Sequence, residues 1–263
     1  MDESLPPVTV EHFDEWYGGM ASANERDRVW QRLLGLPPEL VSTSLLSMSG
    51  LREVTGLLSL GPDSVLLDLA CGRGGYGLWL ARETGCRLVG VDFSAVAIDD
   101  ASRRVGTFGL DGRAEFRLGD LRATGLPDGA VDAVLCVDAI QFASDGDADG
   151  VKAAAAEVGR VLRPGGRAAL TTWEPLDRDD EALPPRIRAV DLAAALPAGG
   201  LVDVSVVDRP DWHALECALW AEVMALDPGD DAGLRDAQEE GEFAVGTLLP
   251  RSRRVLATGR APA

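Results

Sequence analysis

The chain has 263 residues, 46% of them hydrophobic and 26% charged, a composition that excludes intrinsic disorder over most of its length. Its 25 basic and 43 acidic residues give a formal net charge of −18, which argues against a nucleic-acid partner because such a surface repels phosphate backbones. No apolar run reaches the roughly 18 residues of a membrane span, and the acidic first twenty residues lack the features of a signal peptide. The four cysteines form no Cys-x-x-Cys pair, so we expect no zinc or other metal site and a location in the reducing cytoplasm.

Helical signals run through residues 11–59. Four apolar side chains recur there at the spacing of one helical face: Phe13, Trp16, Tyr17 and Met20. A second helical stretch, Arg26–Leu34, ends before a Pro-Pro pair, and Gly61 opens a Gly-Pro-Asp break after which the period changes. We therefore expect residues 1–59 to form a helical cap.

From residue 60 onward, short apolar runs alternate with helical stretches. The runs are Val65–Ala70, Arg87–Val91, Ala114–Leu118, Val131–Val137, Arg167–Thr172, Val202–Val207 and Arg254–Thr258, and the helical stretches are Gly77–Glu83, Ala95–Val105, Lys152–Leu162 and Ile187–Leu196. Strands that alternate with crossover helices predict an α/β fold with a mainly parallel sheet covered on both faces. We expect residues 60–210 and 250–263 to form this core, and residues 211–249 to form a helical insert that contributes to the cap.

The strongest local pattern lies directly after the first run. Gly72-Arg73-Gly74-Gly75-Tyr76-Gly77 matches G-x-G-x-x-G, and Asp92 follows 20 residues after the first glycine, as in a dinucleotide-binding fingerprint. Asp68 argues against that interpretation, because a buried first strand usually carries an apolar residue at this position. A carboxylate there suits a ligand with a positive charge, such as an ammonium group, and can also orient the amides of the loop.

Further motifs follow in register. The segments Asp68–Gly74, Leu88–Ser94, Arg117–Leu121, Val131–Phe142 and Glu157–Gly166 resemble, in order and spacing, the motifs of class I S-adenosylmethionine-dependent methyltransferases of the small-molecule type. The resemblance covers about residues 60–175. It implies a single domain over residues 1–263, with a Rossmann-like seven-stranded sheet whose last strand is antiparallel, and S-adenosyl-L-methionine as the cofactor.

The same resemblance implies roles for individual residues. Asp92 would bind the ribose hydroxyls, Asp120 the adenine amino group, and Phe93 with Leu121 would enclose the ring. The alternative for both aspartates is an ordinary N-cap or turn residue. The full set of predicted cofactor-binding residues is Tyr17, Asp68, Ala70, Gly72, Gly74, Asp92, Phe93, Asp120, Leu121, Val137 and Gln141.

The acceptor side is less defined. A carboxylate acceptor needs no general base, whereas a phenol, an amine or an activated carbon often does. The candidate bases are His213 in the insert, His12 in the N-terminal helical region, Glu174 after the fifth run and Asp138 after the fourth, with His213 slightly favoured. The predicted substrate-binding residues are Trp16, Met20, Trp173, His213 and Trp220. Each of the tryptophans would serve equally well as plain core of the cap, and a lone histidine is more often an ordinary surface or core residue.

We therefore expect a methyltransferase that acts on a small molecule, first on an oxygen of a secondary metabolite and next on nitrogen or carbon. One alternative is a non-methylating S-adenosylmethionine-binding enzyme such as a cyclase. The other is an NAD-dependent oxidoreductase, although the chain lacks the Tyr-x-x-x-Lys pair of one such class. An exposed apolar helix would serve equally as a lid or as a homodimer interface, so the oligomeric state stays open.

Overall fold

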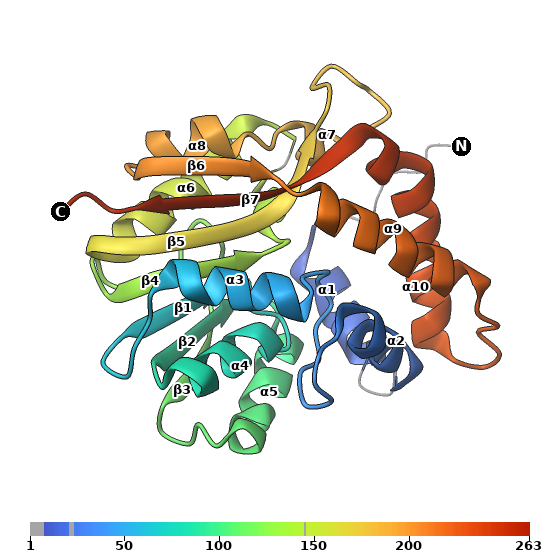
Figure 1. The fold of residues 1–263 in the computed structure, drawn as a ribbon, viewed down its shortest axis with the longest axis horizontal. Helices are drawn as coiled ribbons and strands as arrows, with labels where there is room; N and C mark the ends of the chain where they lie inside the picture. The colour runs from blue at the N-terminus through green and yellow to red at the C-terminus, as the bar shows by residue number, and fades with distance from the viewer. Residues whose placement is uncertain (1–7, 21–23, 145) are drawn as a thin grey trace.

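The computed structural model describes residues 8–20, 24–144 and 146–263, so residues 1–7 and 21–23 of the predicted cap lie outside it. Within the described residues, seven strands form one sheet in the order β3-β2-β1-β4-β5-β7-β6 (Figure 1). Their bounds are β1 Val65–Leu69, β2 Arg87–Asp92, β3 Ala114–Leu118, β4 Val131–Val137, β5 Leu162–Pro175, β6 Val202–Asp208 and β7 Ser252–Arg260. Each apolar run predicted from the sequence falls on one of these strands.

Strand β1 pairs in parallel with β2 on one side and with β4 on the other, so that Leu67 is in register with both Val89 and Val134. The strand order reverses at this point, and parallel sheets bind ligands beyond the carboxyl ends of strands next to such a reversal. Strand β7 runs antiparallel to both β5 and β6. The predicted Rossmann-like sheet with an antiparallel last strand is therefore confirmed.

Helices cover both faces of the sheet (Figure 1). The α-helices of the described residues are α1 Val10–Gly19, α2 Asn24–Leu34, α3 Met48–Leu58, α4 Gly75–Thr84, α5 Ala95–Arg104, α6 Ala148–Val161, α7 Pro185–Arg188, α8 Leu192–Ala198, α9 Pro210–Ala225 and α10 Ala232–Phe243. Leu66 and Ala169 belong to the core under α3 and α4, whereas Leu67 and Leu170 belong to the core under α6 and α8. This division follows from the two-residue period of a strand, which sends neighbouring side chains to opposite faces.

Two predicted boundaries differ from the structure. The stretch predicted as one helix at 187–196 forms α7 and α8, because the Asp191 side chain accepts a hydrogen bond from Ala194 N (3.1 Å) and starts a new helix. Helix α3, which falls in the predicted cap, buries Leu51 and Val54 in the same core as the sheet residues. The cap that overhangs the strand ends therefore ends before α3.

The N-terminal helices and the insert pack against each other although they lie about 200 residues apart in the chain. The Arg26 guanidinium of α2 binds the Glu240 carboxylate of α10, with the closer contact at 3.1 Å. The rings of Trp30 and Trp220 meet edge to face at 5.5 Å and join α2 to α9. Together these helices cover one end of the sheet. Among the described residues, no helix is long and apolar enough to cross a membrane.

Candidate functional site

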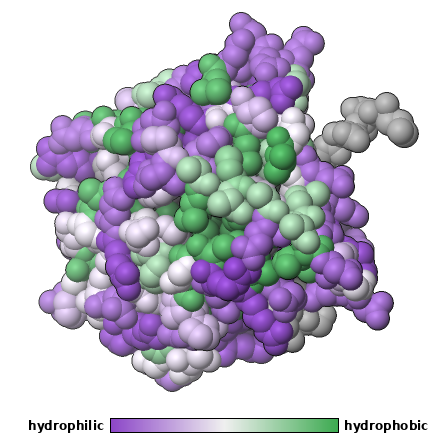
Figure 2. Space-filling view, turned by 45° about the vertical axis from the view of Figure 1, so that its right-hand side comes forward, coloured by the Kyte–Doolittle hydropathy of each residue, from purple (hydrophilic) through white to green (hydrophobic). Residues whose placement is uncertain are grey.

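A cavity of about 1020 Å³ lies beyond the carboxyl ends of β1, β2 and β4. Its lining comes from the loops after these strands and after β3, from segment 41–45, and from α1, α9 and α10. Figure 2, which brings the side of α9 and α10 forward, shows apolar residues gathered in the middle of this face and hydrophilic residues around them. The cavity therefore lies where the strand order reverses, with the cap on top of it.

The loop after β1 turns tightly, with a left-handed backbone at Ala70 (φ +57°) and Gly72 (φ +51°). A β carbon at Gly72 would lie 2.7 Å from the hydroxyl oxygen of Tyr17, so the Tyr17 side chain of α1 reaches the loop only because that position is bare. At Gly77, a β carbon would lie 2.5 Å from a carboxylate oxygen of Asp68. The glycines thus allow α1 and a buried carboxylate to approach the backbone closely.

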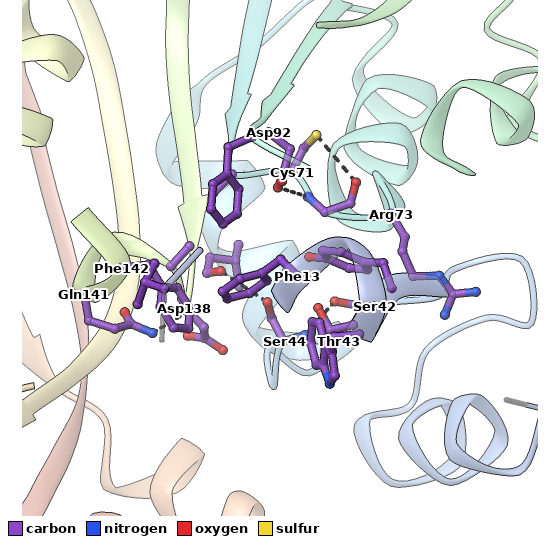
Figure 3. A pocket seen from close by; sticks show the side chains of 18 of the residues that line it. Phe13, Ser42, Thr43, Ser44, Cys71, Arg73, Asp92, Asp138, Gln141 and Phe142 are labelled. Carbon is purple, nitrogen blue, oxygen red and sulfur yellow. Dashed lines mark hydrogen bonds between the residues drawn. The ribbon is translucent and has the colours of Figure 1, made fainter. Parts of the chain in front are cut away.

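Asp92 is the last residue of β2 and is buried against this loop. One carboxylate oxygen accepts a hydrogen bond from Gly72 N (2.8 Å; Figure 3). The other accepts one from Ser94 N (3.0 Å). Burial raises the pKa of Asp92, and these backbone hydrogen bonds oppose the rise. Each carboxylate oxygen has a further lone pair, so Asp92 can accept two more hydrogen bonds, as the two hydroxyls of a diol would donate.

Asp68 on β1 lines the same part of the cavity. Its Oδ2 accepts a hydrogen bond from Gly77 N (3.1 Å) in the first turn of α4. Burial raises the pKa of Asp68 to about 7; the Gly77 hydrogen bond opposes this rise, and the charge of Asp92 adds to it. A ligand that brings a positive charge would stabilise the ionised form of this carboxyl group.

Phe93, Asp120 and Leu121 line the cavity after β2 and β3. The Asp120 carboxylate is bound by its neighbour Arg122, with Oδ1 at 2.9 Å from Nε. Burial by itself would raise the pKa of Asp120, but the hydrogen bonds from Arg122 outweigh it and the pKa is lowered. The carboxylate predicted to contact adenine is thus held by a guanidinium.

Helix α1 places an aromatic ring in the middle of the cavity (Figure 3). The Phe13 ring lies 5.1 Å from that of Phe93 and 5.3 Å from that of Phe142. On the same helix, the Asp14 carboxylate accepts a hydrogen bond from Ser94 Oγ (2.5 Å) at the N-terminus of α5. Helix α1 is therefore fixed to the loops that follow β2 and β4 and closes the cavity over them.

The residues after β4 are buried and fully engaged. Asp138 accepts hydrogen bonds from Leu45 N (2.9 Å), Thr171 Oγ1 (2.6 Å) and Arg254 Nη2 (2.7 Å). The Gln141 amide donates to the carbonyl oxygen of Asp138 (2.7 Å) and accepts from Thr172 Oγ1 (2.9 Å). These contacts fix the floor of the cavity and occupy most of the acceptor sites of the Asp138 carboxylate.

The methyltransferase domain family matches residues 66–166, from β1 into β5. Among curated proteins, the methyltransferase GfsG of Streptomyces halstedii is 32% identical over 139 residues, which are 52% of this chain and 48% of that protein. Residues 66–166 therefore carry a methyltransferase domain. The glycine pattern at residues 72–77 could belong to a dinucleotide-binding loop or to a methyltransferase loop, and the family match favours the methyltransferase loop. The predicted methyltransferase assignment is thereby confirmed for this part of the chain.

Solved structures share the fold of the methyltransferase domain over almost the whole chain. A geranyl diphosphate methyltransferase in complex with GPP and sinefungin has 20% sequence identity and a TM-score of 0.69, covering 97% of this chain and 99% of that one. The [4+2]-cyclase SpnF has 21% identity and a TM-score of 0.66, covering 99% and 98%. At such identities the likeness concerns the fold. The chain spans about half the length of the first curated relatives it matches.

Most of the predicted cofactor residues of the methyltransferase domain line the cavity. Gly74 does not: it precedes α4 and packs against Phe116 and Ala101. Those that do are Tyr17, Asp68, Ala70, Gly72, Asp92, Phe93, Asp120, Leu121, Val137 and Gln141.

About half of the residues predicted for the acceptor side line the cavity, and the others do not. Trp16, Trp173, Trp220 and Asp138 line the cavity. Met20, Glu174 and His213 do not belong to its lining. Met20 is buried at the end of α1. The Glu174 carboxylate instead binds Arg253 Nη2 (2.9 Å) and Leu192 N (2.9 Å), beside the cap. His213 lies near the start of α9, and its buried Nδ1 has no hydrogen-bond partner in the part of the chain that the structure describes.

Sequence reasoning missed several residues of this lining, and two of them, Phe13 and Glu216, bear directly on the site. Phe13 entered only as part of an apolar stripe, although its ring contacts both Phe93 and Phe142. Glu216 was not considered, yet it is the acid that α9 contributes to the cavity. A carboxylate one helical turn before Trp220, in a segment already predicted to form the cap, is the signal that would have found it.

Proposed function

We propose that the whole chain is an S-adenosylmethionine-dependent methyltransferase whose acceptor is a small molecule, first an oxygen of a secondary metabolite and next a nitrogen or carbon atom. One observation carries this proposal. A single cavity of about 1020 Å³ joins the Asp68–Asp92 cradle to an aromatic compartment walled by Trp173 and Trp220. We call these parts the cofactor half and the acceptor half. The volume lies at the upper end of the range for small-molecule sites and leaves room for two ligands.

The residues of the cofactor half fit this cofactor. Asp92 has acceptor capacity for the ribose hydroxyls, and the bare backbone at Gly72 lets a ligand approach closely. Asp68 would face a positively charged group, and Phe93 offers a ring face for the base. When bound, S-adenosylmethionine supplies a methyl group made electrophilic by the positively charged sulfur.

The chain itself aligns the two reactants and excludes water from them. Methyl transfer is an in-line displacement whose rate depends strongly on the alignment of the two reactants and on the exclusion of water. Helix α1 closes the cavity through the Asp14–Ser94 hydrogen bond, and Trp16 Nε1 donates to Glu240 Oε1 (3.1 Å) on α10. The acceptor would thus be held between the cap and the ends of β4 and β5.

Calorimetric titration with S-adenosylmethionine, S-adenosylhomocysteine and NAD, side by side, tests the cofactor. We expect binding of the first two and none of NAD. Binding of NAD alone would overturn the proposal. Methyl transfer from labelled cofactor to any small acceptor then separates a transferase from a protein that binds the cofactor without using its methyl group, as the cyclase alternative requires.

The cytoplasmic location remains a proposal that rests on the sequence.

A further inference from the structure

The acceptor half contains a buried carboxylate, Glu216, that is not among the residues proposed to hold the cofactor. Glu216 on α9 is 2% exposed and lines the cavity. Its Oε1 accepts from the indole N–H groups of Trp173 (3.2 Å) and Trp220 (3.3 Å), and its Oε2 accepts from that of Trp173 (3.0 Å). A carboxylate offers about four lone-pair sites, so two indole donors leave acceptor capacity unfilled.

The cation nearest Glu216 is shared with a second acid. Arg254 on β7 is 1% exposed, and its guanidinium lies 4.2 Å from the ring centre of Trp173. Its Nη2 donates to Asp138 (2.7 Å), whereas its Nη1 lies 3.5 Å from Glu216 Oε2. Nε and Nη1 of Arg254 have no hydrogen-bond partner among the described residues. One buried guanidinium therefore faces two buried carboxylates, and it lies closer to Asp138 than to Glu216.

The two carboxylates differ in what stabilises their charge. Besides the hydrogen bond from Arg254, Asp138 accepts one from Leu45 N and one from Thr171 Oγ1. Glu216 has only neutral indole donors and a guanidinium beyond hydrogen-bond length. Burial raises the pKa of Glu216, and the charge of Arg254 only partly opposes this rise. A buried acid with too few hydrogen-bond donors destabilises the folded protein. An additional donor from a ligand would therefore stabilise Glu216 more than it would stabilise Asp138.

The surroundings define the kind of ligand that would supply this donor. Trp173 and Trp220 form aromatic walls beside Glu216, and Phe243 continues them on α10. The charged residues that α9 and α10 contribute to the cavity are all acids: Glu216, Asp236, Glu239 and Glu240. The lining also includes basic residues, among them Arg186 of α7, whose guanidinium lies 5.5 Å from the centre of the Phe142 ring. Next to Glu216 itself, an apolar molecule with an O–H or N–H group would gain a hydrogen bond, whereas a carboxylate on the same frame would be repelled by the Glu216 charge.

We propose that Glu216 receives the acceptor: it accepts a hydrogen bond from an O–H or N–H group on an aromatic or apolar frame and takes that proton during the reaction. With an O–H acceptor, the O–H bond breaks, its proton moves to a Glu216 carboxylate oxygen, and the electron pair left on oxygen forms the bond to the methyl group, whose bond to the cofactor sulfur breaks. With an N–H acceptor, the nitrogen lone pair forms the bond to the methyl group first, and the cationic nitrogen then gives its proton to Glu216. Arg254 acts as a positioning residue that keeps Glu216 in place. This inference rests on the proposed function and adds the chemical class of the acceptor to it.

The test uses the full chain saturated with S-adenosylhomocysteine at pH 8 and three probes of one shape: 4-ethylphenol, 4-ethylaniline and 4-ethylbenzoate. Calorimetry on the wild-type complex should show the phenol and the aniline binding at least about tenfold more tightly than the benzoate, the ratio expected for a hydrogen bond to a charged group. Equal or tighter binding of the benzoate, or no binding of the phenol, would overturn the inference.

The variant Glu216→Gln sharpens the test. The two indole donors will hold the amide oxygen, so the amide N–H₂ group is left for the cavity and the preference for the phenol should fall about tenfold or reverse. Glu174→Gln is the matched control, because Glu174 is an equally buried carboxylate that does not line the cavity; it should leave all three affinities unchanged. An unchanged phenol affinity in Glu216→Gln would contradict the inference.

Binding of S-adenosylhomocysteine separates the two proposals. If the wild-type chain fails to bind it, the proposed function fails. If wild type binds it but shows no preference among the probes, only the role of Glu216 fails. If Glu216→Gln does not bind it, the variant is misfolded, and the wild-type preference alone decides.

Discussion

The two halves of the cavity are built from different parts of the chain. In the cofactor half, the key contacts involve backbone groups and carboxylates at the ends of adjacent strands, such as Asp92 with Gly72 N. In the acceptor half, side chains from distant elements meet, such as Trp173 of β5, Glu216 of α9 and Arg254 of β7. The first half is fixed by the sheet itself, whereas the second depends on how the cap packs on it. The predictions below test this division.

The largest effect is expected at Asp92. Replacing it with alanine removes the acceptor for the ribose hydroxyls and leaves Gly72 N and Ser94 N without their partner. We expect the affinity for S-adenosylmethionine to fall by about 1.5–3 kcal/mol, the range for a hydrogen bond to a charged group. Calorimetric titration measures this loss, and thermal unfolding of the same sample shows whether the loop has kept its fold. Unchanged affinity in a folded variant would remove Asp92 from the cofactor half.

The second prediction tests whether α1 depends on a bare loop. Gly72→Ala would place a methyl group 2.7 Å from the hydroxyl oxygen of Tyr17, so the Tyr17 side chain on α1 must shift. Gly109→Ala is the matched control, since Gly109 also has a positive φ (+68°) but meets no atom within 4 Å. Both variants carry the backbone strain, and only Gly72→Ala should weaken cofactor binding, by about 1–2 kcal/mol, the cost of a modest overpacking. Equal affinities in the two variants would show that α1 is not needed for binding.

The cofactor half was largely readable from the sequence because its residues follow directly after strands. Asp68, Gly72 and Asp92 each lie at or just beyond a strand end, and parallel strands bring such ends together. Asp120 lines the cavity as expected, yet its pairing with Arg122 could not be read from a motif.

The acceptor half could not be predicted in the same way. The sequence indicates a helix around 210–225, but it does not tell how that helix is rotated against the sheet. His213 and Glu216 are three residues apart on α9, and only packing decides that Glu216 lines the cavity. Similarly, Glu174 looked like a residue of the site because it follows a strand, but Arg253 and Leu192 engage its carboxylate.

The third prediction concerns pH. The pKa of Asp68 is raised to about 7 without a ligand, so at pH 6 most molecules carry a proton that a cationic ligand must displace. Above pH 7 the carboxylate is already ionised. The affinity for S-adenosylmethionine should therefore rise about fivefold between pH 6 and pH 7, as one proton linked to binding requires. Asp68→Asn keeps a hydrogen-bond acceptor for Gly77 N and should flatten this rise; a slope as steep as in the wild type would assign it to another group.

The smallest effect is expected where the two halves meet, at the attachment of α1. Asp14 accepts from Ser94 Oγ (2.5 Å) and faces the N-terminus of α5, where a negative charge is stabilised. Asp14→Ala should weaken cofactor binding by about 0.5–1 kcal/mol, because one hydrogen bond of the closed lid is lost while the cradle itself is intact. Glu11→Ala, a change at an exposed acid on the same helix, is the control for the loss of a negative charge. A loss as large as that of Asp92→Ala would mean that α1 contributes as much to the cofactor half as the sheet does, and the division between the two halves would have to be drawn elsewhere.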